Sequence, residues 1–243
     1  MKRLGIILAM ATLTAAALGQ DTYAVKRIFK QGETDRYNTV IKFEQNETEA
    51  VLVTTDVTRE VKQDGSAVVA TTIDSCVLRA RGTEMPFPGG AGKVILSTYD
   101  PSGKMIKQET LGGGSVGQLV NIARPSVYVE KPMKIGDTIR DEVKTGPDKS
   151  LKGTVTLTFV GVDPKSAELP EECLRYKIVS EMPVAGGAPN MKTRHEYTVR
   201  VSRATGKLVT AEGAMDGPLP NGGTMKLTYK VNRVSPETPK QGS

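Results

Sequence analysis

Two glutamates form the best-matched pair of carboxylates in this sequence. Glu109 and Glu212 each follow, five residues on, the lysine of a Ser-Gly-Lys or Thr-Gly-Lys turn. Paired carboxylates can act as general acid and general base when their separation suits the reaction. A hairpin strand, however, commonly directs a charged residue toward solvent or a neighbouring strand. The sequence therefore favours a structural role for both glutamates.

His195 is the single histidine, and it lies within Thr193-Arg194-His195-Glu196-Tyr197, an alternating segment typical of a strand. A catalytic histidine needs a nucleophile beside it, and the sequence has no Gly-x-Ser-x-Gly elbow that would present a serine. A catalytic pair of His195 with Cys76 or Cys173 is conceivable, but an internal duplication, described below, already explains the presence of both cysteines. We expect His195 on the surface of a strand, with no catalytic residues and no enzymatic activity.

A glycine-rich segment, Gly112-Gly113-Gly114-Ser115-Val116-Gly117, matches the Gly-x-Gly-x-x-Gly pattern of dinucleotide sites, and Asp137 follows twenty residues later. Such a site requires a long helix and a parallel partner strand. Pro125 would end a helix here within about two turns. We interpret the segment as a linker and expect no cofactor. Two cysteines and one distant histidine also lack the spacing of metal ligands such as those of zinc.

Three short motifs occur twice, in one order and at nearly one period. The first copies are Lys30-Gln31-Gly32-Glu33-Thr34-Asp35-Arg36, Cys76-Val77-Leu78-Arg79 with Glu84-Met85-Pro86 and Gly89-Gly90-Ala91, and Ser102-Gly103-Lys104. The second copies are Lys134-Ile135-Gly136-Asp137-Thr138-Ile139-Arg140, Cys173-Leu174-Arg175 with Glu181-Met182-Pro183 and Gly186-Gly187-Ala188, and Thr205-Gly206-Lys207. Repetition of this kind predicts an internal duplication.

The repeat places Cys76 and Cys173 at equivalent positions. In an oxidising compartment they could form a disulfide. Alternatively, each is a small apolar residue buried in its own half of the chain. Spacing leaves both interpretations open, because a disulfide requires Cα atoms within about 7 Å of each other.

A Met-Pro-x-x-Gly-Gly-Ala loop follows each cysteine-containing strand. Met85 and Met182, with Phe87 in the first copy, could form a mouth or lid over an apolar groove, since such side chains adapt to a ligand. The alternative is that both loops are ordinary connections between strands, in which glycine and proline make the turn.

The first nineteen residues have the layout of a secretory signal peptide. Met1-Lys2-Arg3 is basic, the run from Leu4 to Leu18 is uncharged, and small residues precede Gln20. The uncharged run is shorter than the ~20 residues of a membrane-spanning helix. We therefore expect a secreted or periplasmic protein, cleaved near Gly19/Gln20 and not membrane-spanning after cleavage.

The charge pattern argues against a nucleic-acid partner. The formal net charge is +6, and it is scattered without a run of five or six like charges. We interpret the basic residues as a solvated surface. The sequence contains no tryptophan, so platforms for stacking bases or sugars are poor.

Alternating segments separated by turns predict an all-β protein of antiparallel meanders. We expect a first β repeat at 20–112, a linker at 113–125 with one short helix, a second β repeat at 126–234 and a disordered tail at 235–243. Each half would have about six strands, and such a sheet needs cover for its apolar face. The halves could form a sandwich, or one curved sheet or open barrel.

We have four further expectations about local structure. The segment from Tyr23 to Phe29 resembles a first strand, and Val127-Tyr128-Val129 begins the second half as another. Asp64-Gly65 predicts a two-residue type I′ hairpin turn, because both residue types tolerate positive φ. The segment from Thr224 to Val234 predicts a last strand that is extra to the repeat.

The entry pattern Lys-x-Gly-Glu/Asp-Thr-x-Arg and the later Asp-x-Ser-Gly-Lys hairpin resemble those of uncharacterised bacterial secreted proteins. More remotely, the chain is similar to the open-barrel lipoprotein carriers of the periplasm, the LolA-like group. That resemblance implies a curved antiparallel sheet around a lipid-binding cavity under helical lids. This sequence has one candidate helix, whereas the carriers have several.

These observations predict an exported, non-enzymatic binding or envelope-associated structural protein, whose partner is an unidentified envelope component. The alternative is a carrier that holds a lipid or other hydrophobic ligand in a concave β-sheet cavity. A hydrolase-type enzyme is the third possibility and the least favoured, because no nucleophile, base and oxyanion donors can be assembled.

Overall fold

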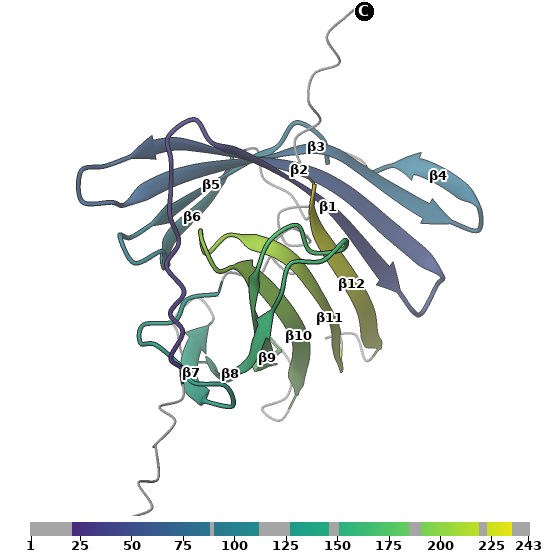
Figure 1. The fold of residues 1–243 in the computed structure, drawn as a ribbon. Helices are drawn as coiled ribbons and strands as arrows, with labels where there is room; N and C mark the ends of the chain where they lie inside the picture. Colours follow the sequence, from purple (N-terminus) through teal and green to yellow (C-terminus); the bar gives the residue numbers. More distant parts are fainter. Residues whose placement is uncertain are drawn as a thin grey trace, which may run out of the picture.

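The structure is an all-β protein (Figure 1). This computed structural model describes residues 21–87, 90–111, 127–145, 151–184, 191–218 and 223–234, which contain strands and no helix. The first half forms β1 (Thr34–Phe43), β2 (Thr48–Val61), β3 (Ala67–Ala80), β4 (Thr83–Pro86), β5 (Val94–Tyr99) and β6 (Met105–Leu111). The second forms β7 (Thr138–Thr145), β8 (Leu151–Asp163), β9 (Cys173–Pro183), β10 (Lys192–Ser202), β11 (Leu208–Pro218) and β12 (Thr224–Val234). The expected signal peptide, linker helix and tail lie outside the described residues.

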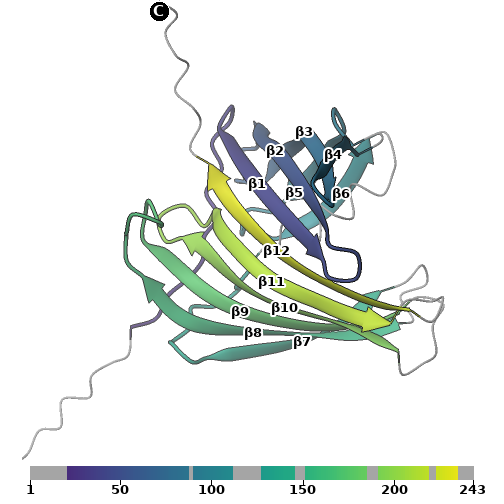
Figure 2. The ribbon, with the colours of Figure 1, turned by 90° about the vertical axis from the view of Figure 1, so that its right-hand side faces the viewer.

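All twelve strands of the described residues belong to one antiparallel sheet. Its order is β6-β5-β3-β2-β1-β12-β11-β10-β9-β8-β7, and β4 pairs with β3 off this path. The sheet is not closed, so β6 and β7 are its two edges. Figure 2 shows β12 between β1 and β11. Strand β12, which is extra to the sequence repeat, therefore joins the two halves. Of the arrangements that the sequence left open, the protein has the single curved sheet.

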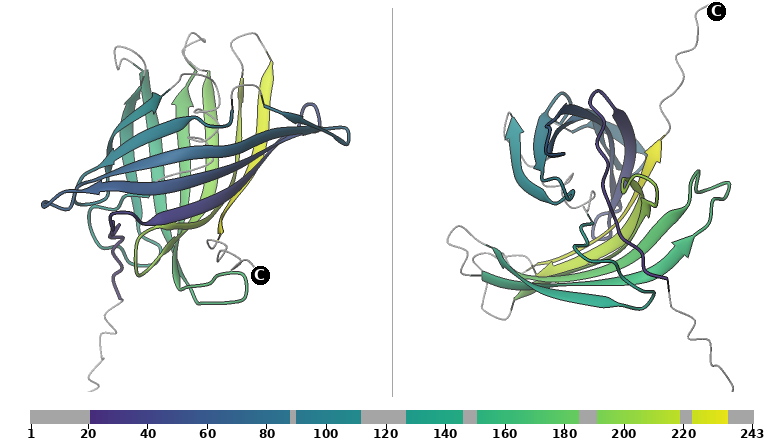
Figure 3. Two further views of the ribbon diagram at one scale, coloured as in Figure 1. Left: turned by 90° about the horizontal axis from the view of Figure 1, so that it is seen from above. Right: turned by 60° about the vertical axis from the view of Figure 1, so that its left-hand side comes forward.

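The two halves of the sheet face each other across one hydrophobic core. Figure 1 shows β1–β6 above β7–β12, and Figure 3 shows strands of one half crossing those of the other. Because side chains alternate along a strand, every second residue of β1 is buried: Tyr37, Thr39 and Ile41. Buried residues of both halves form a single cluster, including Ile41, Leu52, Ile73, Phe159, Tyr176 and Val199. Each half thus covers the apolar face of the other.

The loops that lead into β1 and β7 share one backbone geometry. The N–H of Gly32 donates to the carbonyl of Thr58, and the N–H of Gly136 donates to the carbonyl of Phe159, each over 2.8 Å. Both glycines have positive φ, 78° and 93°, a conformation that glycine adopts without strain. The repeated Lys-x-Gly-Glu/Asp-Thr motif therefore forms the same turn in each half.

Residues 21–30, which we call the N-terminal strap, cross from one half of the protein to the other (purple in Figure 1). Only Tyr23 makes a bridge, with Met133, and the predicted strand from Tyr23 to Phe29 is wrong. The N–H of Ile28 donates to the carbonyl of Thr205 at 2.9 Å. Side chains hold the segment as well, since Val25 is buried in the core cluster and the ring of Phe29 packs on Tyr99.

The strap runs between the two Ser/Thr-Gly-Lys turns. A Cβ built on Gly103, in the β5–β6 turn, would lie 2.7 Å from the Cβ of Arg27. A Cβ on Gly206, in the β10–β11 turn, would lie 2.6 Å from the carbonyl oxygen of Lys26. Both approaches are closer than real Cβ atoms make, so each turn requires glycine. The repeated glycines therefore have two roles: they adopt the positive φ of the turn, and they leave room for the strap to pass.

Two other local expectations differ from the structure. At the β2–β3 turn, the N–H of Gly65 donates to the carbonyl of Lys62, and Gly65 alone in this turn has positive φ, at 88°. Since a type I′ turn needs positive φ at two positions, this is instead a three-residue turn ending in glycine. Residues 127–129 are described without strand structure, because they pack into the core while β7 forms the sheet edge.

The two cysteines are not at equivalent positions, contrary to the sequence repeat. Tyr99 and Ser202 each lie five residues before their turn lysine; Tyr99 pairs with Ala67, and Ser202 pairs with Cys173. Cys173 therefore corresponds to Ala67, whereas Cys76 lies nine residues further along β3. Both are buried free thiols, and no disulfide joins them in this structure.

Candidate functional site

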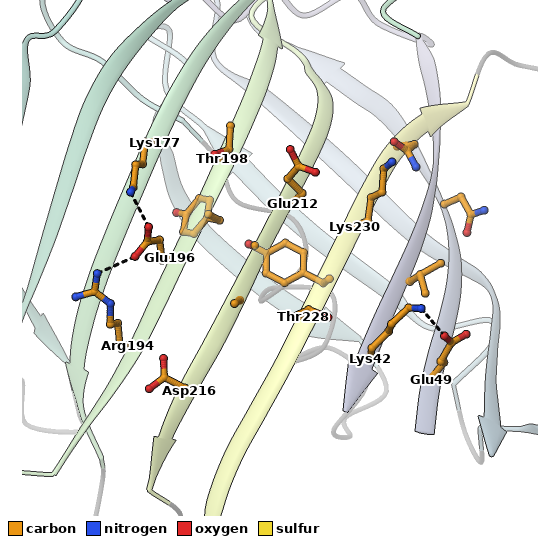
Figure 4. A pocket seen from close by; sticks show the side chains of 17 residues that line it. Lys42, Glu49, Lys177, Arg194, Glu196, Thr198, Glu212, Asp216, Thr228 and Lys230 are labelled. Carbon is orange, nitrogen blue, oxygen red and sulfur yellow. Dashed lines mark hydrogen bonds and ion pairs between the residues drawn. The ribbon is translucent and has the colours of Figure 1, made fainter. Parts of the chain in front are cut away.

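A groove of about 880 Å³ lies on the outer face of the central strands, on the side opposite the core (Figure 4). It extends over β9, β10, β11, β12, β1 and β2. The lining residues are Asn38, Val40, Lys42, Glu49, Lys177, Arg194, Glu196, Tyr197, Thr198, Glu212, Gly213, Ala214, Asp216, Thr228, Tyr229, Lys230 and Asn232. Strands from both halves of the sequence thus form it, on either side of the β1–β12 junction.

The groove is polar because its strands alternate. On β1, Tyr37 and Ile41 are buried in the core, while Asn38 and Lys42 line the groove. The same alternation on β10, β11 and β12 directs a polar residue outward at nearly every second position. A sheet with one apolar and one polar face has its core on one side and a wet surface on the other. The groove is a hollow in that wet surface.

The charges of the groove are balanced. It is lined by four basic residues and by four acidic residues: Lys42, Lys177, Arg194, Lys230, Glu49, Glu196, Glu212 and Asp216. At one wall, Glu196 accepts hydrogen bonds from Lys177 at 2.6 Å and from Arg194 at 2.7 Å. These two donors, Lys177 foremost, lower the pKa of the Glu196 carboxyl. At the opposite wall, Lys42 and Glu49 form an ion pair of 2.9 Å.

An aromatic cluster lies behind this surface, around a glycine. Gly213 pairs with Tyr197 on β10 and with Tyr229 on β12. A Cβ at Gly213 would lie 2.4 Å from the Cβ of Tyr197, so only glycine admits the close approach of these strands. His195 lies next to both rings, with centroids 4.4 Å from Tyr197 and 5.4 Å from Tyr229.

His195 is half-buried on the core side of the sheet, and the expectation of a surface histidine is wrong. Its Nε2 shares a hydrogen bond of 2.8 Å with the hydroxyl of Tyr229. Burial lowers the pKa of His195 to about 4, so the ring is neutral at pH 7. Burial likewise raises the pKa of Tyr229 and Tyr197, the latter to about 12. At neutral pH the cluster is a set of uncharged hydrogen-bonding rings.

A smaller recess of about 610 Å³ continues the groove toward the β8–β9 end. Asp163 bridges two guanidinium groups there: Oδ1 lies 3.0 Å from Arg175, and Oδ2 lies 2.8 Å from Arg200. Arg200 also contacts Glu212 at 3.3 Å. Because Glu212, Lys230 and Asn232 line both hollows, the polar surface is continuous across seven strands, from β8 to β2.

The predicted carboxylate pair does not meet. Glu109 lies on edge strand β6, where it pairs with Lys107 at 2.7 Å. Glu212 lies on β11, where Arg200 is its partner. The strands β5, β3, β2, β1 and β12 separate β6 from β11 along the sheet. Each glutamate therefore has a neighbouring cation.

The three residues proposed for a ligand mouth lie in different surroundings. Met85 is 48% exposed on β4. Phe87 packs against the core, and its N–H donates to the carbonyl of Cys76. Met182 pairs with Thr193 in the sheet, and its sulfur covers Gly153. Met85 and Met182 belong to opposite halves, and a common mouth remains a prediction.

Of the residues that line the groove, Glu212 was singled out from the sequence and the others were missed. Alternation alone puts Arg194 and Glu196 on one face of a strand. Their third partner, Lys177, is known only from the register that sets Lys177 opposite Thr198 on the neighbouring strand. Such pairing between strands is not visible in a single sequence.

Within the described ranges, no group of three or more histidine, cysteine, aspartate or glutamate side chains is arranged to hold a metal ion. The same residues include no helix long and apolar enough to cross a membrane.

Comparisons with known proteins give little further guidance. No protein-family model matches the sequence, and no curated protein matches it. Among solved structures, the chain is similar to DynF from the dynemicin biosynthesis pathway of Micromonospora chersina. That likeness covers 93% of this chain and 90% of the other at 10% identity, with a TM-score of 0.23. A likeness of this strength carries no argument about fold or function.

Proposed function

We propose that the protein is an exported, non-catalytic binding module whose outer groove takes an extended polypeptide segment carrying both signs of charge. The observation that carries the proposal is the balance of four basic and four acidic side chains around one hollow. Export is supported by the N-terminal sequence pattern.

The chemistry of the groove favours a polypeptide over other polymers. A nucleic acid would meet four carboxylates along with the cations, and like charges oppose its binding. A glycan usually stacks on exposed rings, but Tyr229 is buried in the core. A polypeptide supplies backbone donors and acceptors for Asn38 and Thr228, and side chains of either sign for the walls.

The interior supports a binding module over a carrier. A carrier needs an apolar cavity on the order of 300–1,000 Å³. Between the halves, the side chains of Tyr37, Phe159 and Tyr176 are fully buried in one contact cluster, as in a filled core. The 880 Å³ groove lies on the opposite, polar face.

The absence of tryptophan from the sequence permits a specific test. Thr198→Trp puts a single fluorophore in the groove wall, and Thr156→Trp puts one on the same outer face of β8, outside the groove. The probe is a synthetic peptide of alternating lysine, serine, glutamate and threonine. All-lysine and all-glutamate peptides of equal length are the charge controls.

We expect the mixed peptide to shift the emission of Thr198→Trp with saturation and to leave Thr156→Trp unchanged. The two single-charge peptides should bind more weakly, because each meets four like charges. Calorimetry on the unaltered protein should give the same order of affinities. Equal responses from both fluorophores, or no saturable binding of the mixed peptide, would refute the proposal.

A further inference from the structure

Strand β6 is the last strand at one end of the sheet. Among the described strands it pairs with β5 alone. All seven of its residues are exposed, whichever face they occupy. Figure 1 and Figure 3 show β6 at the free end of the upper half of the sheet. A strand in this position presents unpaired backbone donors and acceptors to another chain.

The edge is apolar as well as unpaired. Met105, Ile106 and Leu111 are 38%, 61% and 52% exposed. Proteins commonly protect an open edge with charges, and the other edge, β7, carries Arg140, Asp141, Glu142 and Lys144 in eight residues. Strand β6 has two charged residues in seven, and these neutralise each other. A bulge at Ile106 interrupts the pairing of β6 with β5 at one point, but in charge the β6 edge is the less protected of the two.

The sequence of β6, Met-Ile-Lys-Gln-Glu-Thr-Leu, is complementary to itself when reversed. In an antiparallel pair centred on Gln108, Lys107 of each chain faces Glu109 of the other. Met105 faces Leu111, and Ile106 faces Thr110. Two ion pairs and two apolar contacts would form at once, and such cross-strand pairs stabilise a sheet.

The charges also select this register over its neighbours. A pair centred on Lys107 would put two lysines directly opposite each other, and one centred on Glu109 would do the same with two glutamates. Like charges in directly opposed positions destabilise an antiparallel pair. The centre at Gln108 is the one that opposes unlike charges throughout.

We propose that β6 pairs antiparallel with β6 of a second copy of this chain, in the register centred on Gln108. The result is a two-fold dimer in which the sheet continues from one copy to the next. An interface of this kind is isologous, because each copy contributes the same residues. It is small, so the dimer forms reversibly with concentration. It uses the end of the sheet away from the outer groove and does not depend on the proposed function.

The test is sedimentation velocity on the mature protein over about 10 to 500 μM, a range suited to a small interface. We expect a monomer–dimer equilibrium for the unaltered chain. Lys107→Glu and Glu109→Lys each place like charges opposite one another at two positions of the homodimer. Each should weaken dimerisation about tenfold or more. Glu142→Lys on the β7 edge is the matched control and should leave the equilibrium unchanged.

Charge exchange makes the result specific to the register. An equimolar mixture of Lys107→Glu and Glu109→Lys restores unlike pairs in the heterodimer, and the double variant restores them in the homodimer. Both samples should dimerise as the unaltered chain does. Circular dichroism checks that each variant is folded. An unaltered chain that stays monomeric throughout the range overturns the proposal and leaves the edge to a strand of another protein. A dimer that neither single variant weakens overturns it as well.

Discussion

The Nζ atom of Lys207 lies 2.6 Å from Oδ2 of Asp35, although 172 positions separate the two residues. Lys207 also contacts Glu33 at 2.7 Å and is only 4% exposed. It comes from the β10–β11 turn, whereas the two carboxylates belong to the entry of β1. Two motifs that the sequence repeats are thus joined across the β12 junction by a buried ammonium group.

Replacing Lys207 with methionine should lower the free energy of unfolding by about 2 kcal/mol, because two partly buried carboxylates lose their cation. The measurement is urea unfolding at pH 7. Lys104 holds the equivalent position in the first half but is exposed, with Nζ 5.7 Å from the Tyr128 ring. Lys104→Met should change stability by less than about 0.5 kcal/mol. Equal losses from the two variants would contradict a special role for Lys207.

Gly206→Ala should loosen the N-terminal strap. The new Cβ would lie 2.6 Å from the carbonyl oxygen of Lys26, in addition to the strain of its positive φ of 66°. We expect a loss of about 2–3 kcal/mol and faster tryptic cleavage after Lys26 and Arg27. Gly136→Ala is the control, since its φ is 93° but nothing lies within 4 Å. It should cost about 1 kcal/mol through backbone strain alone and leave cleavage unchanged.

The alternation of side chains in the sequence was sufficient to predict most strands. It was not sufficient to predict which strands lie next to each other in the sheet. The alternation of Met225, Leu227, Tyr229 and Val231 predicts β12 with the bounds that it has. Its place between β1 and β11 was not predictable, because hydrogen bonds between distant segments leave no periodic mark in one sequence. The groove depends on that placement, and so most of its lining residues were missed.

The cysteine motif illustrates a different error. Cys76 and Cys173 precede similar residues in the sequence, yet the register aligns Cys173 with Ala67. Similar residues can lie at non-equivalent positions when one half has an additional element, as the first half has the short strand β4 among the described strands. His195 was misjudged because a strand in a two-faced sheet has equal chances of either face, and pattern alone did not assign the buried one.

The stability of the protein should fall in mild acid because of His195. Burial lowers its pKa to about 4 in the folded state, whereas an unfolded histidine has a pKa of about 6.5. Between these values the unfolded chain binds a proton that the folded chain does not, so stability is complete above about pH 6.5 and declines toward pH 4. This group contributes a loss of about 2 kcal/mol between pH 7 and pH 4.5.

His195→Gln removes the titration and keeps a hydrogen-bonding group near Tyr229. The measurement is urea unfolding of both proteins at pH 7 and pH 4.5. Carboxylates that titrate at low pH affect both proteins equally. The difference between the two proteins in how the free energy of unfolding changes with pH is therefore due to the histidine. Identical slopes for the two proteins would mean that His195 ionises in the folded state as it does in the unfolded state.

Both thiols should be unreactive while the protein is folded. Burial raises the pKa of Cys76, and it raises that of Cys173 to about 11, with the nearby Asp163 carboxylate adding to the effect. The thiolate is the reactive form, so a disulfide-exchange reagent at pH 8 should modify neither residue in minutes. In denaturant it should modify two thiols per chain, since both are free. A mass 2 Da below that of the reduced chain, or no thiol titrating after unfolding, would show instead that the cysteines pair in the protein in solution.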